Sequence, residues 1–429
     1  MKSNNVKNNK RFRYWRRRTL YSIMIGYGTF YLVRQNFALA IPFICTELNV
    51  NKIDIGLLMS IGGLLYGFGK FLFGLLGDKY SARYVMAIGL LISGILNVLI
   101  GITSLFPALA ILYALNQVVQ AMGAPPCVKL MKHWYSVTEM GRVWSIWTMA
   151  SHISSAMITF YFPVVLIHYG WKAIFYLPGI ISILLSVIIF NRLNDTPETL
   201  GFPPIEKLSG NNNEDDTNNT HNKLEKLSLL ETIILVIKNK NVLCVSFAAL
   251  FVYINRMTFL NWGPTLLMEY RNSSNVGIGY QMALFEISGI VGALAAGYVS
   301  DKLFNGRRAP VGAISMFLLA LTNIIFRFIP KESDILSSIC MLIIGFLISA
   351  TVILVSVSAT DFVNKKIAAS ANGFTGTLCY IGTAVAGIGN GYLAYYYGWN
   401  AVVLLTIISA ICGGILLCTL WNKKPVADK

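Results

Sequence analysis

Long apolar stretches recur along the whole chain and constrain its fold more than any other feature. About twenty apolar residues form a helix long enough to cross a bilayer. Hydrophobic residues make up 55% of the 429 residues and charged residues only 13%, which is too little polar surface to cover a soluble globule. We predict an all-α membrane protein with twelve transmembrane helices. The expected spans are 19–45, 53–76, 84–103, 106–128, 142–167, 172–191, 241–268, 277–299, 309–329, 335–358, 368–396 and 400–421.

Basic residues gather in one set of loops. The chain has 35 Lys and Arg against 19 Asp and Glu, and many of the basic residues lie in residues 2–18 and in the central loop. Cytoplasmic loops carry such an excess, so both termini are expected in the cytoplasm. The basic start is expected to lie against anionic lipid, and no nucleic acid is expected as a partner. The expected parts are a basic N-terminus (1–18), an N-terminal six-helix half (19–191), a cytoplasmic central loop (192–240), a C-terminal six-helix half (241–421) and a cytoplasmic tail (422–429).

The reactive side chains show no enzymatic pattern. The seven cysteines are scattered along the expected spans without the spacing of a metal or redox site. No nucleophile–base constellation and no phosphate-cradling glycine loop can be recognised. We therefore expect no metal, no cofactor and no enzymatic activity.

The two halves of the chain repeat each other. YLVRQNFALAIPFICTEL, from Tyr31, aligns with YINRMTFLNWGPTLLMEY, from Tyr253, at one constant offset. Farther on, YGWKA at 169 aligns with YGWNA at 397. Both halves begin on the same side of the membrane, so the repeat is parallel and predicts two pseudo-symmetric six-helix halves with a ligand site between them. The aligned pairs include Tyr31 with Tyr253, Arg34 with Arg256, Phe37 with Phe259, Pro42 with Pro264 and Glu47 with Glu269.

Arg34 and Arg256 are cations placed at equivalent positions deep inside expected spans. A charge at membrane depth is kept only where it faces a cavity, a partner or a ligand. Two guanidinium groups suit a doubly charged anion, because each can bind phosphate or carboxylate in a bidentate manner. The alternative is that each arginine is neutralised by a buried acid, with Glu286 the leading partner and Asp361 a weaker one. Lys70 adds a third cation, which either joins the site or reaches the membrane surface.

A second pair of motifs lies in the loops after the second and eighth spans. GDKYSAR contains Asp78 and Arg83, and SDKLFNGRR contains Asp301, Arg307 and Arg308. An acid and several bases in a short turn can latch adjacent helices in one state of a rocking cycle. The alternative is an ordinary basic loop that only follows the topology rule.

The motifs together resemble the organophosphate:phosphate antiporter family of the major facilitator superfamily. The resemblance runs from about residue 11 to 420 and rests on FYLVRQNFALAIP, YGFGKFLFGLLGD, QAMGAPPC, DTPETLGFPP, FVYINR and NGFTG. It implies a monomer in a bacterial inner membrane that exchanges an organophosphate for inorganic phosphate, with Arg34 and Arg256 holding the phosphoryl group. By the same resemblance, the cavity would be surrounded by Lys70, Tyr27, Tyr31, Tyr66, Trp147, Tyr253 and Tyr380.

Charge inside the membrane also bears on mechanism. The interior offers only Glu286 and His152 as groups able to titrate, and both are counted among the expected site residues. A cavity with surplus positive charge is poorly suited to closing empty. We therefore expect the protein to exchange one anion for another, because the bound anion supplies the charge that draws the halves together.

Four positions depart from the family pattern. Ala124 replaces a tryptophan, Ser151 replaces a histidine with His152 one place later, Asn261 replaces an aspartate, and Ser349 begins a segment that lacks the family's aromatic residue and proline. We favour glycerol-3-phosphate as the cargo. A wider cavity, expected from Ala124 and Ser349, would instead favour hexose phosphate, and a third hypothesis is a sugar-phosphate receptor that signals to a histidine kinase.

Overall fold

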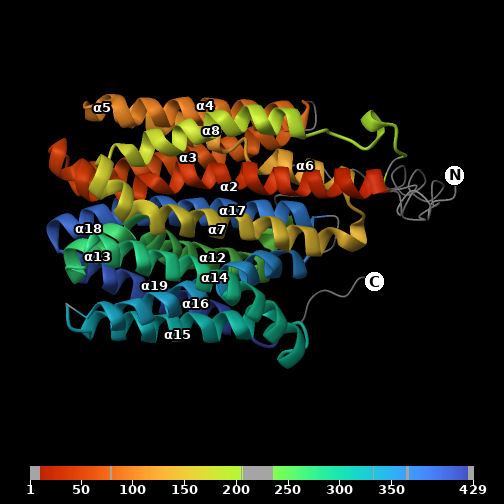
Figure 1. The fold of residues 1–429 in the computed structure, drawn as a ribbon. Helices are drawn as coiled ribbons and strands as arrows, with labels where there is room; N and C mark the ends of the chain where they lie inside the picture. The colour runs from red at the N-terminus through yellow and green to blue at the C-terminus, as the bar shows by residue number, and fades with distance from the viewer. Residues whose placement is uncertain are drawn as a thin grey trace.

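The computed structural model describes residues 10–77, 80–203, 205, 235–331, 333–363 and 367–423 as helices joined by short connections (Figure 1). Most of the central loop and Asp78 lie outside these residues. The first helices are α2 (Lys10–Glu47), α3 (Lys52–Gly77), α4 (Ala82–Ile102), α5 (Phe106–Gln120), α6 (Ala124–Trp134), α7 (Val137–Tyr169), α8 (Ala173–Arg192) and the short η1 (Glu198–Leu200). The later ones are α12 (Lys240–Met257), η2 (Thr258–Trp262), α13 (Gly263–Arg271), α14 (Asn275–Leu303), α15 (Arg308–Phe328), α16 (Asp334–Asp361), α17 (Ala368–Ala384), η3 (Val385–Gly389), α18 (Asn390–Tyr396) and α19 (Trp399–Cys418).

Ten helical segments among the described residues are long and apolar enough to cross a membrane. They coincide with ten of the expected spans. The first and eleventh expected spans correspond to α2, which begins in the basic N-terminal segment, and to α17–η3–α18, which a π turn divides. These two are not among the ten, so the count of twelve stays a prediction, whereas the all-helical membrane fold is confirmed.

The helices of the two halves lie side by side in one bundle. Figure 1 shows the early helices, red to yellow, on one side and the later helices, green to blue, on the other, with α7 and α17 between them. Helices α2 and α7 of the first half pack against α13 and α14 of the second, and α3 packs against α17, η3 and α18. A Cβ atom on Gly56 would lie 2.6 Å from the Gly387 carbonyl oxygen, so glycine is needed where α3 meets η3.

The repeat seen in the sequence has a physical counterpart in each half. Glu47, at the end of α2, accepts a hydrogen bond from the Trp171 indole, and Glu269, in α13, accepts one from the Trp399 indole. Each tryptophan follows a glycine in a conformation that side chains disfavour, with φ of 75° at Gly170 and 74° in the second half. The YGW motif therefore turns the chain so that the indole reaches the preceding glutamate.

The two glutamates differ in the cation that each one meets. Lys172 follows Trp171 and pairs with Glu47 at 2.9 Å within the first half. Donation from the Trp171 indole and from Lys172 lowers the pKa of the Glu47 carboxyl below its ordinary value. Asn400 takes the place of Lys172 in the second half and accepts a hydrogen bond from Tyr270 instead.

Among the described residues, Glu269 therefore has no cationic partner in its own half, and it pairs with Lys52 of the other half. Between described residues, further polar contacts that join the halves include Ser60 with Ala384 and Ile388, and His152 with Glu286. These contacts lie from the middle of the bundle to the end opposite the start of α2. The structure is thus a conformation in which the halves are joined at that far end.

Removing the charge of Glu269 should loosen the far end of the bundle. A partly exposed ion pair contributes about 0.2–1 kcal/mol, so Glu269→Gln should raise the labelling rate of a cysteine placed at the cavity residue Met59 by up to about fivefold. The measurement is maleimide labelling of detergent-purified protein whose native cysteines have been replaced. Glu47→Gln, which breaks only a contact within one half, is the matched control and should leave the rate unchanged. Equal effects of the two substitutions would contradict a role for Glu269 in joining the halves.

Candidate functional site

Arg34 on α2 and Arg256 on α12 line one cavity of about 60 Å³ between the halves. The two helices occupy equivalent places in the repeat, so the repeat itself brings both arginines to the same cavity. The remaining lining residues are Tyr31, Gln35, Phe37, Ala38, Met59, Gly63, Tyr113, Gln117, Met257, Leu260, Asn261 and Thr383.

Neither arginine takes part in an ion pair with a described acid. The Arg34 guanidinium instead lies 4.1 Å from the ring centroid of Tyr66 and 5.9 Å from that of Tyr31. Aromatic faces attract cations but do not cancel their charge. The positive charge of the cavity is therefore left for a ligand to balance.

The two acids considered as partners for the arginines are occupied elsewhere. Glu286 on α14 lies with its carboxylate 2.8 Å from the Nδ1 atom of His152 on α7. Asp361, at the end of α16, lies 3.6 Å from the Arg308 guanidinium. The alternative, that these acids neutralise Arg34 or Arg256, is therefore not found among the described residues.

Lys70 and two tyrosines form a second cationic group farther along α3. The Lys70 ammonium lies 5.2 Å from the ring centroid of Tyr66, and Tyr66 contacts Tyr380 of the other half at 5.9 Å between centroids. Lys70 lies seven residues beyond the cavity residue Gly63, which is about 10 Å along a helix. Because the Tyr66 ring also contacts Arg34, this group is joined to the cavity between the arginines through Tyr66.

The other expected aromatic residues lie beside the cavity. Tyr27 stacks between Tyr31 and Trp147, at 5.3 Å and 4.5 Å between centroids, and only Tyr31 of the three lines the cavity. The buried Trp147 indole nitrogen has no hydrogen-bond partner among the described residues. Tyr253 packs against the main apolar core.

Three amide side chains line the cavity although only one of them, Asn261, stood out in the sequence. Gln35 follows Arg34 on α2, Gln117 lies on α5 and Asn261 lies in the π turn η2. Adjacency to Arg34 could have pointed to Gln35. Nothing in the sequence predicts the π turn that bears Asn261.

The wider cavity expected from two of the departures is not found. Neither Ala124 nor Ser349 lines the cavity. Ser349 lies where α16 packs against α14, and a Cβ atom on Gly289 would lie 2.5 Å from its hydroxyl oxygen. Ala124 is the first residue of α6 and packs against apolar residues of the first half. Loss of the larger family residues therefore changes helix packing, not the cavity walls.

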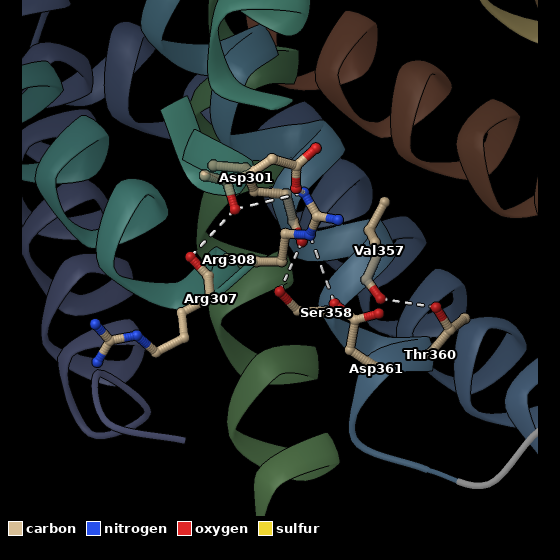
Figure 2. Close-up of polar contacts among 9 residues, drawn as sticks. Asp301, Arg307, Arg308, Val357, Ser358, Thr360 and Asp361 are labelled. Carbon is tan, nitrogen blue, oxygen red and sulfur yellow. Dashed lines mark hydrogen bonds and ion pairs between the residues drawn. The ribbon is translucent and has the colours of Figure 1, made fainter. Parts of the chain in front are cut away.

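The second basic loop joins three elements through one arginine. Figure 2 shows the Arg308 guanidinium pointing toward both Asp301 and Asp361, at 2.8 Å and 3.6 Å, whereas the Arg307 side chain points away. Arg307 donates only to the nearby Phe304 carbonyl. In the first half, Arg83 donates to the Phe190 carbonyl of α8, and its predicted partner loop residue Asp78 lies outside the described residues.

Replacing Arg308 should cost more stability than replacing Arg307. Arg308→Gln leaves the mostly buried Asp361 carboxylate without a cation, and an unsatisfied buried group costs about 1–3 kcal/mol. The measurement is the thermal midpoint of the purified protein, with Arg307→Gln as the matched control. Adding Asp361→Asn to the Arg308→Gln protein should recover part of the loss. A midpoint that falls equally in both single variants would show that the two arginines act only through net charge.

The His152–Glu286 pair generates a similar prediction at mid-bundle. His152→Ala should lower the thermal midpoint by several degrees, because the Glu286 side chain is only 7% exposed and would lose its partner. Glu286→Gln in the same protein should restore stability, since it removes the unpaired charge. His168→Ala, at the exposed end of α7, serves as the control. No recovery in the double variant would contradict an ionic role for the pair.

The chain matches known proteins over nearly all of its length. Residues 23–387 and 245–429 match the model of the Major Facilitator Superfamily. The chain is 34% identical to a "Probable hexose phosphate transport protein" of Chlamydia trachomatis, over 97% of this chain and 93% of the relative. It is 34% identical to the "Glycerol-3-phosphate transporter" of Bacillus subtilis, over 95% and 92%. It is 32% identical to the "Membrane sensor protein UhpC" of Escherichia coli, over 96% and 94%.

Solved structures share the same arrangement of helices. A bacterial homologue of the human lysosomal transporter Spinster, in an inward-facing and unoccupied conformation, aligns with a TM-score of 0.76 at 14% identity over 96% of this chain and 99% of that one. The nucleoside transporter NupG aligns with a TM-score of 0.72 at 16% identity, over 95% and 100%. At these identities the likeness shows the fold alone. Sequence relatives and fold together show that the chain belongs to the major facilitator superfamily and, within it, to the organophosphate:phosphate antiporter family.

Proposed function

We propose that this protein exchanges glycerol-3-phosphate for inorganic phosphate across the membrane, and that Arg34 and Arg256 hold the phosphate group. Membership of the superfamily makes the chain a multi-pass membrane transport protein and not an enzyme. One observation carries the proposal: two arginines from equivalent places in the repeat line one cavity without an acidic partner among the described residues.

The chemistry of the cavity supports a phosphate group as the ligand. Each guanidinium can offer two parallel N–H donors to the oxygens of a phosphate. Two of them balance the two negative charges that a phosphate monoester carries near neutral pH. Because one arginine comes from each half, a bound phosphate would draw the halves together, which is the differential affinity that alternating access requires.

The names of the relatives suggest two candidates for the organic part of the cargo. The Bacillus subtilis relative is named for glycerol-3-phosphate and the Chlamydia trachomatis relative for hexose phosphate, at the same identity to this chain. Both names share the phosphate monoester that the arginines are proposed to bind. We place glycerol-3-phosphate first, and hexose phosphate is the second candidate because of the chlamydial relative.

The orientation proposed for the chain indicates which side of the membrane this conformation closes. With the basic N-terminus in the cytoplasm, the far end that Lys52 and Glu269 join is the external face. The structure then corresponds to a state closed toward the outside. The site would be loaded and emptied from the cytoplasmic side in this state.

Arg34→Lys and Arg256→Lys should each lower phosphate exchange by at least about a hundredfold, because an ammonium cannot replace the bidentate fork. Loss of a charged hydrogen-bonded contact of this kind costs about 2–5 kcal/mol. The assay is uptake of labelled phosphate or glycerol-3-phosphate into proteoliposomes preloaded with phosphate, compared with empty vesicles. Arg142→Lys, at an exposed position, is the control and should exchange normally.

Near-normal exchange by both arginine variants would contradict the proposed site. Uptake of glucose-6-phosphate but not glycerol-3-phosphate would keep the site and change the cargo. If the unaltered protein moves no phosphate yet binds a sugar phosphate, a sensor role like that named for the Escherichia coli relative takes the place of transport.

A further inference from the structure

The cavity lined by the two arginines is also lined by three amide side chains, which are neutral and do not balance the arginine charges. Gln35, Gln117 and Asn261 come from α2, α5 and η2 and line the same cavity as Arg34 and Arg256. No aspartate or glutamate lines it. Two of the amides come from the first half and one from the second, so the group spans the interface that moves during alternating access.

Gln35 is a buried amide with no hydrogen-bond partner among the described residues. Its side chain belongs to a residue only 8% exposed, at the cavity wall. Because Gln35 lines the cavity and bonds to no other described residue, its amide can donate to and accept from a ligand there. The neighbouring Gln117, 4% exposed, lies beside the Tyr113 hydroxyl, which lines the same wall.

A π turn brings Asn261 to the cavity. In a regular α-helix, residues five apart are rotated by about 140° from each other, so Arg256 and Asn261 would face different directions. The π turn η2, Thr258–Trp262, widens the helix at this point, and both side chains line the cavity. π turns of this kind are frequent at functional sites. Among the described residues, the one hydrogen bond of the Asn261 side chain is a weak one to the Met257 sulfur, at 4.0 Å.

The chemistry of these groups matches hydroxyls. An amide both donates and accepts hydrogen bonds, as a hydroxyl does, whereas a carboxylate on the ligand would need a further cation and an amine would need an acid. The apolar side chains of Met59, Met257 and Leu260 lie in the same lining and suit a short carbon chain.

We propose that Gln35, Gln117 and Asn261 form a subsite that recognises the hydroxyl groups of a polyol or sugar phosphate. This inference rests on the proposed function and deepens it. Inorganic phosphate binds through the arginines alone, and the amides set which organic phosphates are accepted. Phosphorylated compounds without hydroxyls, or with a carboxylate in their place, bind more weakly.

Competition against phosphate exchange tests the subsite separately from the arginines. Labelled phosphate exchanges against phosphate in proteoliposomes, and unlabelled glycerol-3-phosphate, glucose-6-phosphate, propyl phosphate and 3-phosphoglycerate are added as competitors. In the unaltered protein, whichever of the first two competes better should do so at a concentration at least about tenfold lower than propyl phosphate, which corresponds to one or two hydrogen bonds. Equal competition by propyl phosphate would overturn the proposal.

The variants Gln35→Leu, Gln117→Leu and Asn261→Leu give the second arm of the test. In each variant, competition by the polyol or sugar phosphate should weaken by about three- to tenfold more than competition by unlabelled phosphate. Gln120→Leu is the matched control, since Gln120 is a buried amide on the same helix as Gln117, bonded to Ser93 outside the cavity. Equal weakening of the two kinds of competitor would show that the amides only support the fold.

The two proposals fail in different ways. If the unaltered protein carries out no phosphate exchange in vesicles, the proposed function fails. In that case, binding of the same four compounds to detergent-purified protein still measures the preference for hydroxyls. A preference that persists in binding and is lost in the amide variants supports the subsite, and its absence overturns it.

Discussion

Two positive charges at membrane depth, without acidic partners among the described residues, are the constraint on which the rest of the structure depends. A guanidinium at membrane depth costs several kcal/mol unless something balances it. Among the described residues, Arg34 contacts the aromatic faces of Tyr66 and Tyr31, and neither arginine pairs with an acid. The internal repeat makes this arrangement possible, because one position on the first helix of each half becomes two facing cations. The other contacts between the halves determine how close the two arginines lie.

Small breaks in the repeat determine how the halves meet. Each half ties a glutamate to the tryptophan of its YGW turn, which fixes the turn. Lys172 completes this contact in the first half, but Asn400 cannot do so in the second, and Glu269 pairs with Lys52 across the interface. One substitution between equivalent positions thus converts an internal contact into one that holds a conformation. The symmetric part of the repeat builds the halves, and the asymmetric part connects them.

Sequence patterns predicted the features that depend on composition and spacing, and missed those that depend on local geometry. Hydropathy and charge predicted the helical membrane fold, and the repeat predicted a site between the halves at Arg34 and Arg256, which line one cavity. The π turn at Asn261 could not be predicted, because helical periodicity assumes a regular turn. The pairing of Glu286 with His152 depends on how α14 packs against α7, which spacing within one helix does not encode. Ser349 was misassigned for the same reason, since its neighbour Gly289 lies on another helix.

The charges of the interface also bear on why such a protein would exchange rather than release its cargo. The Lys52–Glu269 ion pair is internally balanced, and together with the His152–Glu286 contact it joins the halves whether or not the site is filled. The arginines are not balanced, so bringing them closer in an empty cavity is unfavourable at low dielectric. When a phosphate is bound between the arginines, bringing them closer becomes electrostatically favourable. The proposed ligand is then a structural part of the closed interface, and its departure must be matched by another anion before the halves can close again.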